Sequence, residues 1–291
     1  LSSETFGSGD MLDEYFRRQL FGDDPLTALV DDQGPFIEIN ASDLFKGSRF
    51  GFTPGQFALI CSDIDGFPVA RAVAASCAVP IIFSPVTLAN RAGSCGYIPP
   101  AWLNEALGES GTNNRRYRAA QRISRYLDSE ISPYIHLLDG GLTDNLGLRA
   151  VLDRIIASGD LLNTLKHFHK DQVSHIALVI VDASSRPPSK WEKRASAPPD
   201  TVVLDAATTA PLANYSFESV EYLYANLDNW LVDLRKERCL GKRNCSNPDF
   251  YLVQIRIGDI VDPVLRERLS AVPTGFSLAP EVVDALFESG V

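Results

Sequence analysis

The chain alternates short apolar runs with segments in which apolar residues return at helical spacing. Runs of about four to eight apolar residues are typical of strands, and helical spacing is typical of helices with one buried face. The runs predict strands at residues 35–40, 134–138, 175–181 and 251–257. The spaced segments predict helices near residues 10–20, 68–79, 102–107, 148–156, 217–238 and 280–287. Strands that alternate with helices indicate an α/β protein with a mostly parallel central sheet covered on both faces.

The predicted helix at residues 68–79 is built almost entirely from small side chains. Pro68 suits a first helical position, and Pro80 ends the helix because proline cannot donate the next backbone hydrogen bond. Alanine, serine and cysteine side chains let two backbones approach closely. We therefore expect this helix to pack tightly on the sheet.

Composition and charge narrow the class of protein. Hydrophobic residues make up 45% of the 291 positions and charged residues 22%, which excludes disordered and fibrous chains. The longest apolar run, Ile176–Val181, is far shorter than the roughly 20 residues of a membrane-spanning helix. The net charge of −10 disfavours binding of nucleic acid and electrostatic docking on anionic lipid. A peripheral membrane contact would therefore have to be apolar.

The five cysteines do not form a metal-binding pattern. None has the C-x-x-C spacing of zinc sites, so a zinc centre is not expected. For Cys239 and Cys245, which flank a polar loop, two free thiols are the default and a short disulfide in an oxidising compartment is the alternative. Asp63–Gly66 has the character of a calcium loop but lacks the remaining ligands and the closing glutamate. No metal or other cofactor is predicted.

A basic segment precedes the strand predicted at residues 134–138. Five arginines fall between positions 115 and 125, with no acidic residue among them, at a spacing that suits one helix face. We expect a solvated surface here. Contact with a lipid headgroup or with a partner is the alternative.

Asp139-Gly140-Gly141 follows the strand predicted at residues 134–138 and precedes a helix. The carboxyl end of a strand is where α/β proteins place functional groups. We expect the glycines to adopt positive φ and to leave room for a ligand or a second side chain beside Asp139. Spacing alone leaves a second interpretation open, in which Asp139 only binds local amides in a strand-to-helix turn.

Three segments share their order and spacing with one known family. His136–Leu146 contains the Asp-Gly-Gly motif, and Ala74–Val86 fits the pattern Ala-Ser-x-Ala-x-Pro followed by Phe-x-Pro. Ile39–Leu44, followed by Gly47, fits a preceding strand and turn. Together they resemble the patatin-like phospholipases, and the bacterial members most. The resemblance extends more loosely to Val179–Ser184 and Val272–Leu278.

The resemblance implies a three-layer α/β/α fold with a mostly parallel central sheet and a Ser–Asp catalytic dyad. In the family a serine in a G-x-S-x-G elbow attacks an ester carbonyl, an aspartate acts as base, and a glycine-rich loop supplies oxyanion-hole amides. Asp139 matches the dyad aspartate, with Gly140 and Gly141 as structural residues beside it. One patatin-like domain is implied over residues 1–291, with a core at 1–185 and residues 200–291 packed on it.

The serine of this dyad has no counterpart in the 291 residues. G-x-S-x-G is absent, and near misses at Gly47–Gly51, Gly93–Gly96 and Gly108–Gly111 have the wrong spacing and setting. In the family both the elbow and the oxyanion loop precede the matched region. Because the chain starts at Leu1 and its one methionine is Met11, we expect an upstream portion to be missing, with the serine and any signal peptide. The 291 residues alone are predicted to be inactive.

The leading hypothesis is a serine-type lipid acyl hydrolase, a phospholipase or esterase without metal or cofactor. Its substrate would be a lipid or another acyl ester; headgroup, regiospecificity and oligomeric state stay open. The alternative is a non-catalytic lipid-binding or scaffolding relative that lacks the nucleophile. A third hypothesis is an unrelated α/β ligand-binding protein in which Asp139 only turns the chain. Cell envelope, secretion and cytoplasm stay open as locations.

Overall fold

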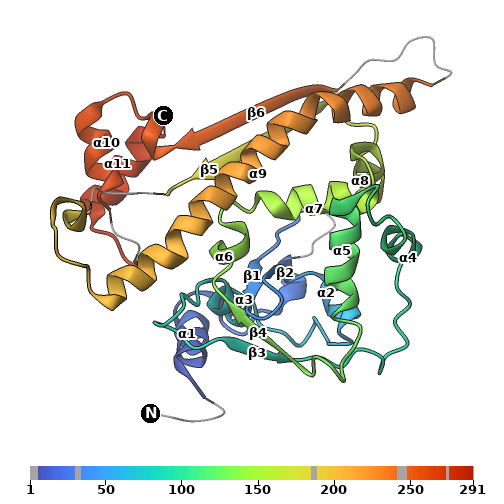
Figure 1. Ribbon diagram of the computed structural model, residues 1–291, viewed down its shortest axis with the longest axis horizontal. Coiled ribbons are helices and arrows are strands. Elements are labelled where there is room, and N and C mark those ends of the chain that lie inside the picture. Colours follow the sequence, from blue (N-terminus) through green and yellow to red (C-terminus); the bar gives the residue numbers. More distant parts are fainter. Residues whose placement is uncertain (1–5, 30–33, 185–188, 241–247, 273–274, 291) are drawn as a thin grey trace. The chain divides into compact units, whose positions relative to one another are not determined.

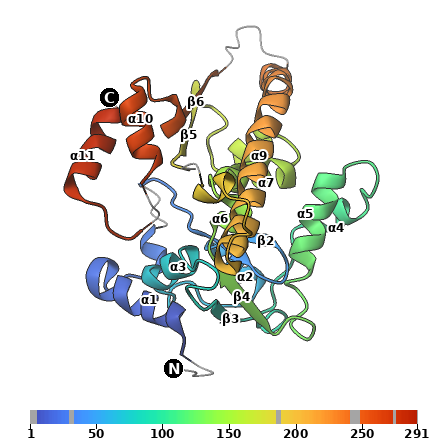
Figure 2. The same ribbon diagram turned by 60° about the vertical axis from the view of Figure 1, so that its left-hand side comes forward.

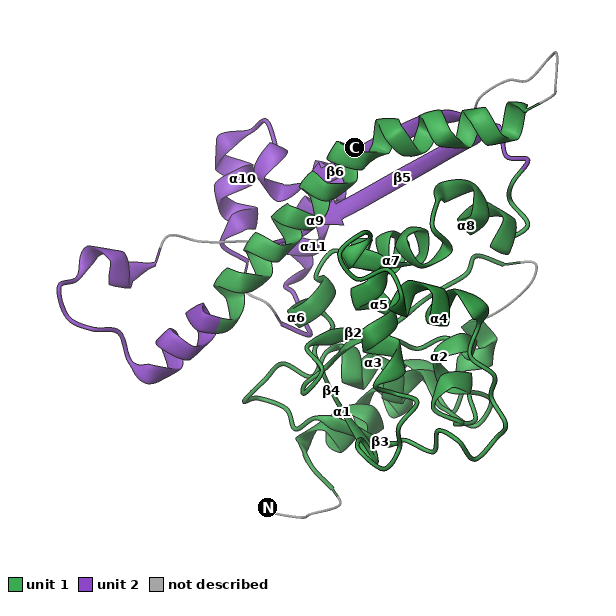
Figure 3. Ribbon diagram, turned by 45° about the vertical axis from the view of Figure 1, so that its right-hand side comes forward, with its two compact units in different colours: residues 1–171, 208–245 green, residues 172–207, 246–291 purple. Residues whose placement is uncertain are grey.

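The computed structural model describes residues 6–29, 34–184, 189–240, 248–272 and 275–290. The chain divides into two compact units, one of residues 1–171 and 208–245 and one of residues 172–207 and 246–291 (Figure 3). The single domain expected over residues 1–291 stays a prediction, and each unit is described by itself. Within the described ranges, no helix has the length and apolarity needed to cross a membrane.

The first unit contains a four-stranded sheet in which every neighbouring pair is antiparallel, in the order β2-β1-β4-β3 (Figure 1). Its strands are β1 (Asn40–Asp43), β2 (Ser48–Gly51), β3 (Val86–Ala89) and β4 (Tyr134–Leu138). The predicted three-layer α/β/α fold with a mostly parallel central sheet is therefore wrong. The described chain is mixed α/β, with this antiparallel sheet in the first unit and one parallel strand pair in the second.

A hairpin between β1 and β2 accounts for part of this difference. Asp43 ends β1 and accepts hydrogen bonds from the backbone N–H groups of Phe45 (3.0 Å) and Lys46 (2.9 Å). Gly47 completes the turn with a φ of +56°, a left-handed conformation that favours glycine. Strands joined by so short a turn must be antiparallel. The strand expected at residues 35–40 begins only at Asn40, where this pairing starts.

Asp43 also ties the hairpin to the rest of the unit. Its side chain is 1% exposed and lies 3.2 Å from the Lys46 ammonium and 3.0 Å from the Tyr126 hydroxyl, which donates to it. The Lys46 ammonium lies 4.4 Å from the centre of the Tyr126 ring. A buried carboxylate with this many partners is part of the fold.

Aromatic side chains form much of the core of this unit. Neighbouring rings in the cluster pack edge-on or tilted, with centroids 5.2–6.5 Å apart. Such pairs each add about 0.5–1.5 kcal/mol beyond the burial of their area. The cluster consists of Phe50, Phe52, Phe57, Phe67 and Tyr126.

Helix α3 (Val69–Ser76) is buried on two faces, which explains its small residues. Ala72 belongs to the core beside the sheet, whereas Ala70 packs with Leu12 of α1 (Ser8–Phe16). Both views show α1 and α3 side by side (Figure 1, Figure 2). The close packing expected for this helix is confirmed. Its second face is buried because α1 packs against it.

Shorter helices complete the first unit. They are α2 (Pro54–Leu59), α4 (Ala101–Leu107), α5 (Asn114–Ser124), α6 (Gly141–Asp144), α7 (Leu148–Ser158) and α8 (Leu161–His167), with a π-helical turn at Arg17–Phe21 and a 3₁₀ turn at Leu26–Leu29.

Helix α9 (Asp200–Cys239) has 40 residues and starts well before the predicted residue 217. The added part contains several alanines, which favour helix, and it accommodates Pro211 in its interior. The prediction failed here because Pro211 and the polar residues around it weaken the apolar spacing.

The second unit contains a parallel pair, β5 (His175–Asp182) and β6 (Asp249–Arg256). It also contains α10 (Pro263–Ser270), α11 (Pro280–Ser289) and short 3₁₀ turns at Lys190–Lys193 and Ile257–Asp259. The parallel direction expected for β5 is confirmed for this pair. Its expected burial is wrong, because only Ile180 in β5 is buried.

The disulfide bonds of the structure differ from those expected from the sequence. Cys61 and Cys95 are joined, although their 34-residue separation carries no recognisable spacing signal. Cys239 is disulfide-bonded, so a free thiol there was the wrong default. Cys245 lies outside the described residues.

Glu38 forms the central carboxylate of a buried ion network. Its side chain is 8% exposed and binds the guanidinium groups of both Arg49 and Arg154. Arg154 also lies over the rings of Phe36 (4.9 Å) and Phe168 (5.3 Å). Burial lowers the pKa of Arg154, and Glu38 opposes that effect. One carboxylate thus compensates two cations.

Replacing Glu38 by Gln should destabilise the fold, because it leaves the partly buried Arg154 without a carboxylate and Arg49 with only Asp153, 3.8 Å from its Nε. We expect a loss of about 3 kcal/mol in the free energy of unfolding, measured with denaturant. Glu14→Gln is the matched control: its ion pair with Arg18 is exposed, so the loss should stay below about 0.5 kcal/mol. Equal losses in the two variants would contradict a structural role for the network.

Candidate active site

The backbone of Asp139 and Gly140 is hydrogen-bonded to the last residue of α3 and to the segment that follows this helix. The N–H of Asp139, which directly follows β4, donates to the carbonyl of Ala78 (3.0 Å). The N–H of Gly140 donates to the carbonyl of Ser76 (3.0 Å). The chain then enters α6 at Gly141. Two of the segments that resemble the patatin-like family are therefore hydrogen-bonded to each other at Asp139.

Gly140 also approaches the third of these segments closely. A Cβ atom at Gly140 would lie 2.4 Å from the backbone oxygen of Asn40 in β1, far inside van der Waals contact. One at Gly141 would lie 3.0 Å from Oδ1 of Asp139. The expected positive φ is wrong, because Gly140 is right-handed (φ −60°) and Gly141 is helical. The glycines are needed for space rather than for an unusual conformation.

The Asp139 carboxylate is half-buried and only partly hydrogen-bonded. Oδ1 accepts the N–H of Gly141 at 2.7 Å. In the described part of the chain no hydrogen bond reaches Oδ2. Desolvation by burial raises the pKa of Asp139, and the Gly141 N–H partly offsets the rise. Burial, and secondarily the Asp139 charge, raises the pKa of the nearby Cys77 thiol.

Asp139 lines an open cavity of about 480 Å³, and all its lining residues belong to the first unit. Each of the three resembling segments contributes to the wall. The lining residues are Glu38, Ile39, Asn40, Val73, Ser76, Asp139, Gly140, Gly141, Asp144 and Asn145.

Asp144 is a cavity carboxylate that sequence reasoning missed. It is 7% exposed, and its two oxygens accept the N–H groups of Arg149 and Ala150 at 3.0 Å each. Burial raises the pKa of Asp144, and these two N–H groups oppose the rise. The available signal was an aspartate shortly before the predicted helix, the position of a capping residue. Asp144 therefore holds the start of α7, whereas Asp139 keeps one oxygen available.

A hydroxyl pair links β1 to the turn after Asp139. Ser42 Oγ lies 2.8 Å from Thr143 Oγ1 and 3.4 Å from the carbonyl of Gly140, across about a hundred residues of sequence. This bridge fixes α6 relative to β1. Sequence reasoning did not single out either residue.

The other sequence patterns do not form a metal site. In the Asp63–Gly66 segment, Asp63 Oδ1 accepts the N–H of Asp65 at 2.9 Å, as in an ordinary turn. Across the described ranges, no group of three or more His, Cys, Asp or Glu residues is placed to hold a metal ion. Of the loosely matching segment Val272–Leu278, Pro273 and Thr274 lie outside the described residues.

Comparisons with known proteins do not identify a family. No protein-family model, no curated protein and no solved structure matches the chain. The resemblance to the patatin-like phospholipases therefore rests on the three sequence segments alone.

Replacing Gly140 by Ala should destabilise the fold, because the new Cβ collides with the backbone oxygen of Asn40. We expect a loss of about 2–3 kcal/mol in the free energy of unfolding, measured with denaturant. Gly55, in α2, has no atom near its own Cβ position. Gly55→Ala is therefore the control and should be neutral or slightly stabilising. If Gly140→Ala were equally harmless, the close approach would be refuted.

Replacing Asp139 by Asn tests whether this carboxylate serves the fold. Because burial raises the pKa of Asp139, its ionised form is less favourable in the folded than in the unfolded chain. At pH 7, Asp139→Asn should keep or increase the free energy of unfolding. The difference should shrink as the pH falls below the raised pKa and vanish near the ordinary aspartate pKa of about 3.9, where Asp139 is protonated in the unfolded chain as well. Denaturant unfolding over a pH series measures both effects.

Asp43→Asn is the contrasting variant in this experiment. It leaves the Lys46 ammonium, 7% exposed, without its carboxylate, and should cost about 3 kcal/mol at pH 7. A similar loss in Asp139→Asn would mean that Asp139 only holds its turn.

Proposed function

We propose that the protein is a patatin-like lipid acyl hydrolase in which Asp139 is the base of a Ser–Asp dyad. The observation that carries the proposal is the meeting of three distant segments at one cavity. The segments around Asn40, Ser76 and Asp139 contact one another. Asp139, whose Oδ2 has no hydrogen bond in the described chain, is one of the residues that line the cavity. If all three segments belong to one family site, they should meet in space, and their meeting at this cavity supports the proposal.

The surroundings of Asp139 suit general-base chemistry. A carboxyl group with an ordinary pKa of about 3.9 is a weak base towards a serine hydroxyl. Burial raises the pKa of Asp139 and so makes the carboxylate a stronger base. The Gly141 N–H holds Oδ1 at 2.7 Å, which orients the carboxylate and leaves Oδ2 for the serine.

The proposed reaction has two steps. Asp139 accepts the serine proton while the serine oxygen attacks the ester carbonyl; the alcohol leaves with that proton, and an acyl-serine remains. A water molecule, deprotonated by Asp139, then attacks the acyl carbon. The bond to the serine oxygen breaks, Asp139 returns the proton to that oxygen, and the fatty acid leaves. No G-x-S-x-G occurs in the 291 residues, so the proposal requires a serine from an N-terminally extended form of the chain.

A non-catalytic lipid-binding or scaffolding relative is the second candidate. The observation in its favour is the same lack of a G-x-S-x-G motif beside an otherwise formed cavity. The sequence upstream of Leu1 discriminates the two: a G-x-S-x-G after an apolar strand favours the enzyme. The third hypothesis, an unrelated α/β ligand-binding protein in which Asp139 only turns the chain, expects Asp139 to lie away from any cleft. It is disfavoured because Asp139 lines a cavity.

Asp139→Asn in the N-terminally extended protein should reduce ester hydrolysis by about 10²–10⁴-fold, because the neutral amide cannot take the serine proton. The assay measures the hydrolysis of p-nitrophenyl butyrate and the release of fatty acid from phospholipid vesicles. Asp65→Asn is the control. Because Asp65 is exposed, this variant should hydrolyse the esters at the wild-type rate. The 291-residue chain alone should be inactive.

Covalent labelling completes this test. A fluorophosphonate should label the extended protein on a serine outside residues 1–291, and Asp139→Asn should slow the labelling. Near-full hydrolysis by Asp139→Asn would refute the dyad. Labelling of a serine within the 291 residues would refute the proposed nucleophile.

A further inference from the structure

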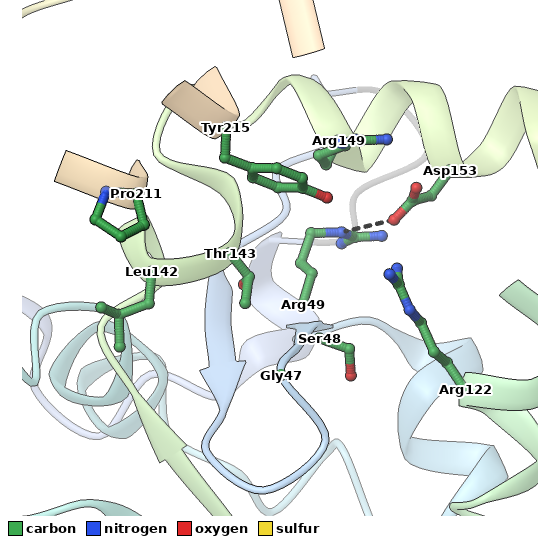
Figure 4. Close-up of a pocket in the computed structure, with 10 residues that line it drawn as sticks. All are labelled: Gly47, Ser48, Arg49, Arg122, Leu142, Thr143, Arg149, Asp153, Pro211 and Tyr215. Carbon is green, nitrogen blue, oxygen red and sulfur yellow. Dashed lines mark ion pairs between the residues drawn. The ribbon is translucent and has the colours of Figure 1, made fainter. Parts of the chain in front are cut away.

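A second cavity, of about 350 Å³, is lined by residues of β2, α5, α6, α7 and α9, and all of these residues belong to the first unit (Figure 4). It shares no lining residue with the Asp139 cavity. Its lining residues are Gly47, Ser48, Arg49, Arg122, Leu142, Thr143, Arg149, Asp153, Pro211 and Tyr215.

The charge of this lining is opposite to that of the chain. The chain has a net charge of −10, yet the cavity is lined by three arginines and one carboxylate, Asp153. The arginines come from three elements: Arg49 from β2, Arg122 from α5 and Arg149 from α7. Guanidinium groups supplied from different elements surround a ligand better than neighbours on one helix.

Two of these arginines are held in place. Arg49 is bound by Glu38 and by Asn40 Oδ1 (2.8 Å), and its buried Nε has no hydrogen bond in the described chain. The nearest carboxylate oxygen to that Nε, on Asp153, is 3.8 Å away. Arg149 donates from Nε to Ser219 Oγ (3.0 Å) and lies 4.7 Å from the centre of the Tyr215 ring.

Arg122 is the third arginine of the cavity, and its guanidinium group is not held by a neighbouring side chain in the described part of the chain. No hydrogen bond or ion pair to it occurs within the described residues. Figure 4 shows its side chain extending from α5 towards Arg49 and Asp153. Another arginine of α5, Arg116, is instead paired with Glu105 and Glu109. The basic segment expected to be solvated thus contains an exposed arginine, Arg118, an ion-paired one, Arg116, and one that lines a cavity, Arg122.

The remaining walls suit an organic group. Leu142, Pro211 and the Tyr215 ring supply apolar surface, and the tyrosine hydroxyl points towards the arginine side chains in Figure 4. The volume lies within the range of small-molecule sites, about 300–1,000 Å³, and exceeds the needs of a bare oxyanion. Guanidinium groups match phosphate oxygens in charge and geometry.

We propose that this cavity binds the phosphate group of an organic phosphate, with the substituent against Leu142 and Tyr215. The phosphate can belong to a soluble phosphate ester or to a lipid headgroup, since the recognised chemistry is the same. The proposal does not depend on Asp139 or on ester hydrolysis, so binding measurements test it separately from the proposed function.

The test compares Arg122→Gln with Arg118→Gln in the 291-residue chain. Arg118 is exposed on the same helix and does not line the cavity, so Arg118→Gln is the matched control. Calorimetry with phenyl phosphate and co-sedimentation with phosphatidylcholine vesicles, with and without phosphatidic acid, are the two arms. Circular dichroism and thermal unfolding check that both variants keep the fold.

Arg122→Gln should weaken phosphate binding by about 10–100-fold, because it removes a charged hydrogen bond. Arg118→Gln should leave phosphate binding unchanged. Benzoate should bind at least about tenfold more weakly than phenyl phosphate, because it offers fewer oxygens and less charge. Binding of phenyl phosphate supports a soluble ester. Binding only to vesicles with phosphatidic acid, lost in Arg122→Gln, supports a headgroup. The proposal would be overturned if the protein bound neither phenyl phosphate nor the vesicles with phosphatidic acid. It would also be overturned if Arg122→Gln bound as tightly as the wild type, or if benzoate bound as tightly as phenyl phosphate.

Discussion

The close approach of Gly140 to the backbone oxygen of Asn40 is the constraint on which the candidate site depends. A side chain at position 140 would separate β1 from the turn that follows β4. The same turn is fixed on its other side by the hydrogen bonds from Asp139 and Gly140 to the end of α3. Three segments far apart in sequence are therefore held together by backbone contacts that need no ligand.

This backbone arrangement determines what each carboxylate of the cavity can do. Asp144 uses both oxygens on N–H groups in the first turn of α7, those of Arg149 and Ala150, so it stabilises the start of this helix. Asp139 uses one oxygen on Gly141, and burial disfavours its ionised form. A carboxylate that is costly to bury and incompletely bonded is typical of a functional group rather than a structural one. Asp43, fully bonded to its hairpin, is the structural counterpart in the same unit.

Local features of the fold were predictable from sequence, and long-range pairings were not. The small residues of α3 and the strand before Asp139 follow from patterns within a few positions. Strand direction in the first sheet depends on a short hairpin at Asp43–Gly47 and on pairing between β1 and β4, which local spacing does not encode. The Cys61–Cys95 disulfide and the arginine cavity likewise unite residues from separate elements. Asp139 was identifiable because its motif is contiguous, whereas the reason for its glycines appears only when β1 lies beside them.

The central claim is that Asp139 faces the reacting serine of an acyl hydrolase. A crystal structure of the N-terminally extended protein, after reaction with a fluorophosphonate, measures this most directly. The account predicts that the modified serine oxygen lies within about 3–4 Å of Asp139 Oδ2, in the cavity bounded by Asn40 and Ser76. A modified serine remote from Asp139, or an extension that leaves this cavity empty, would contradict it.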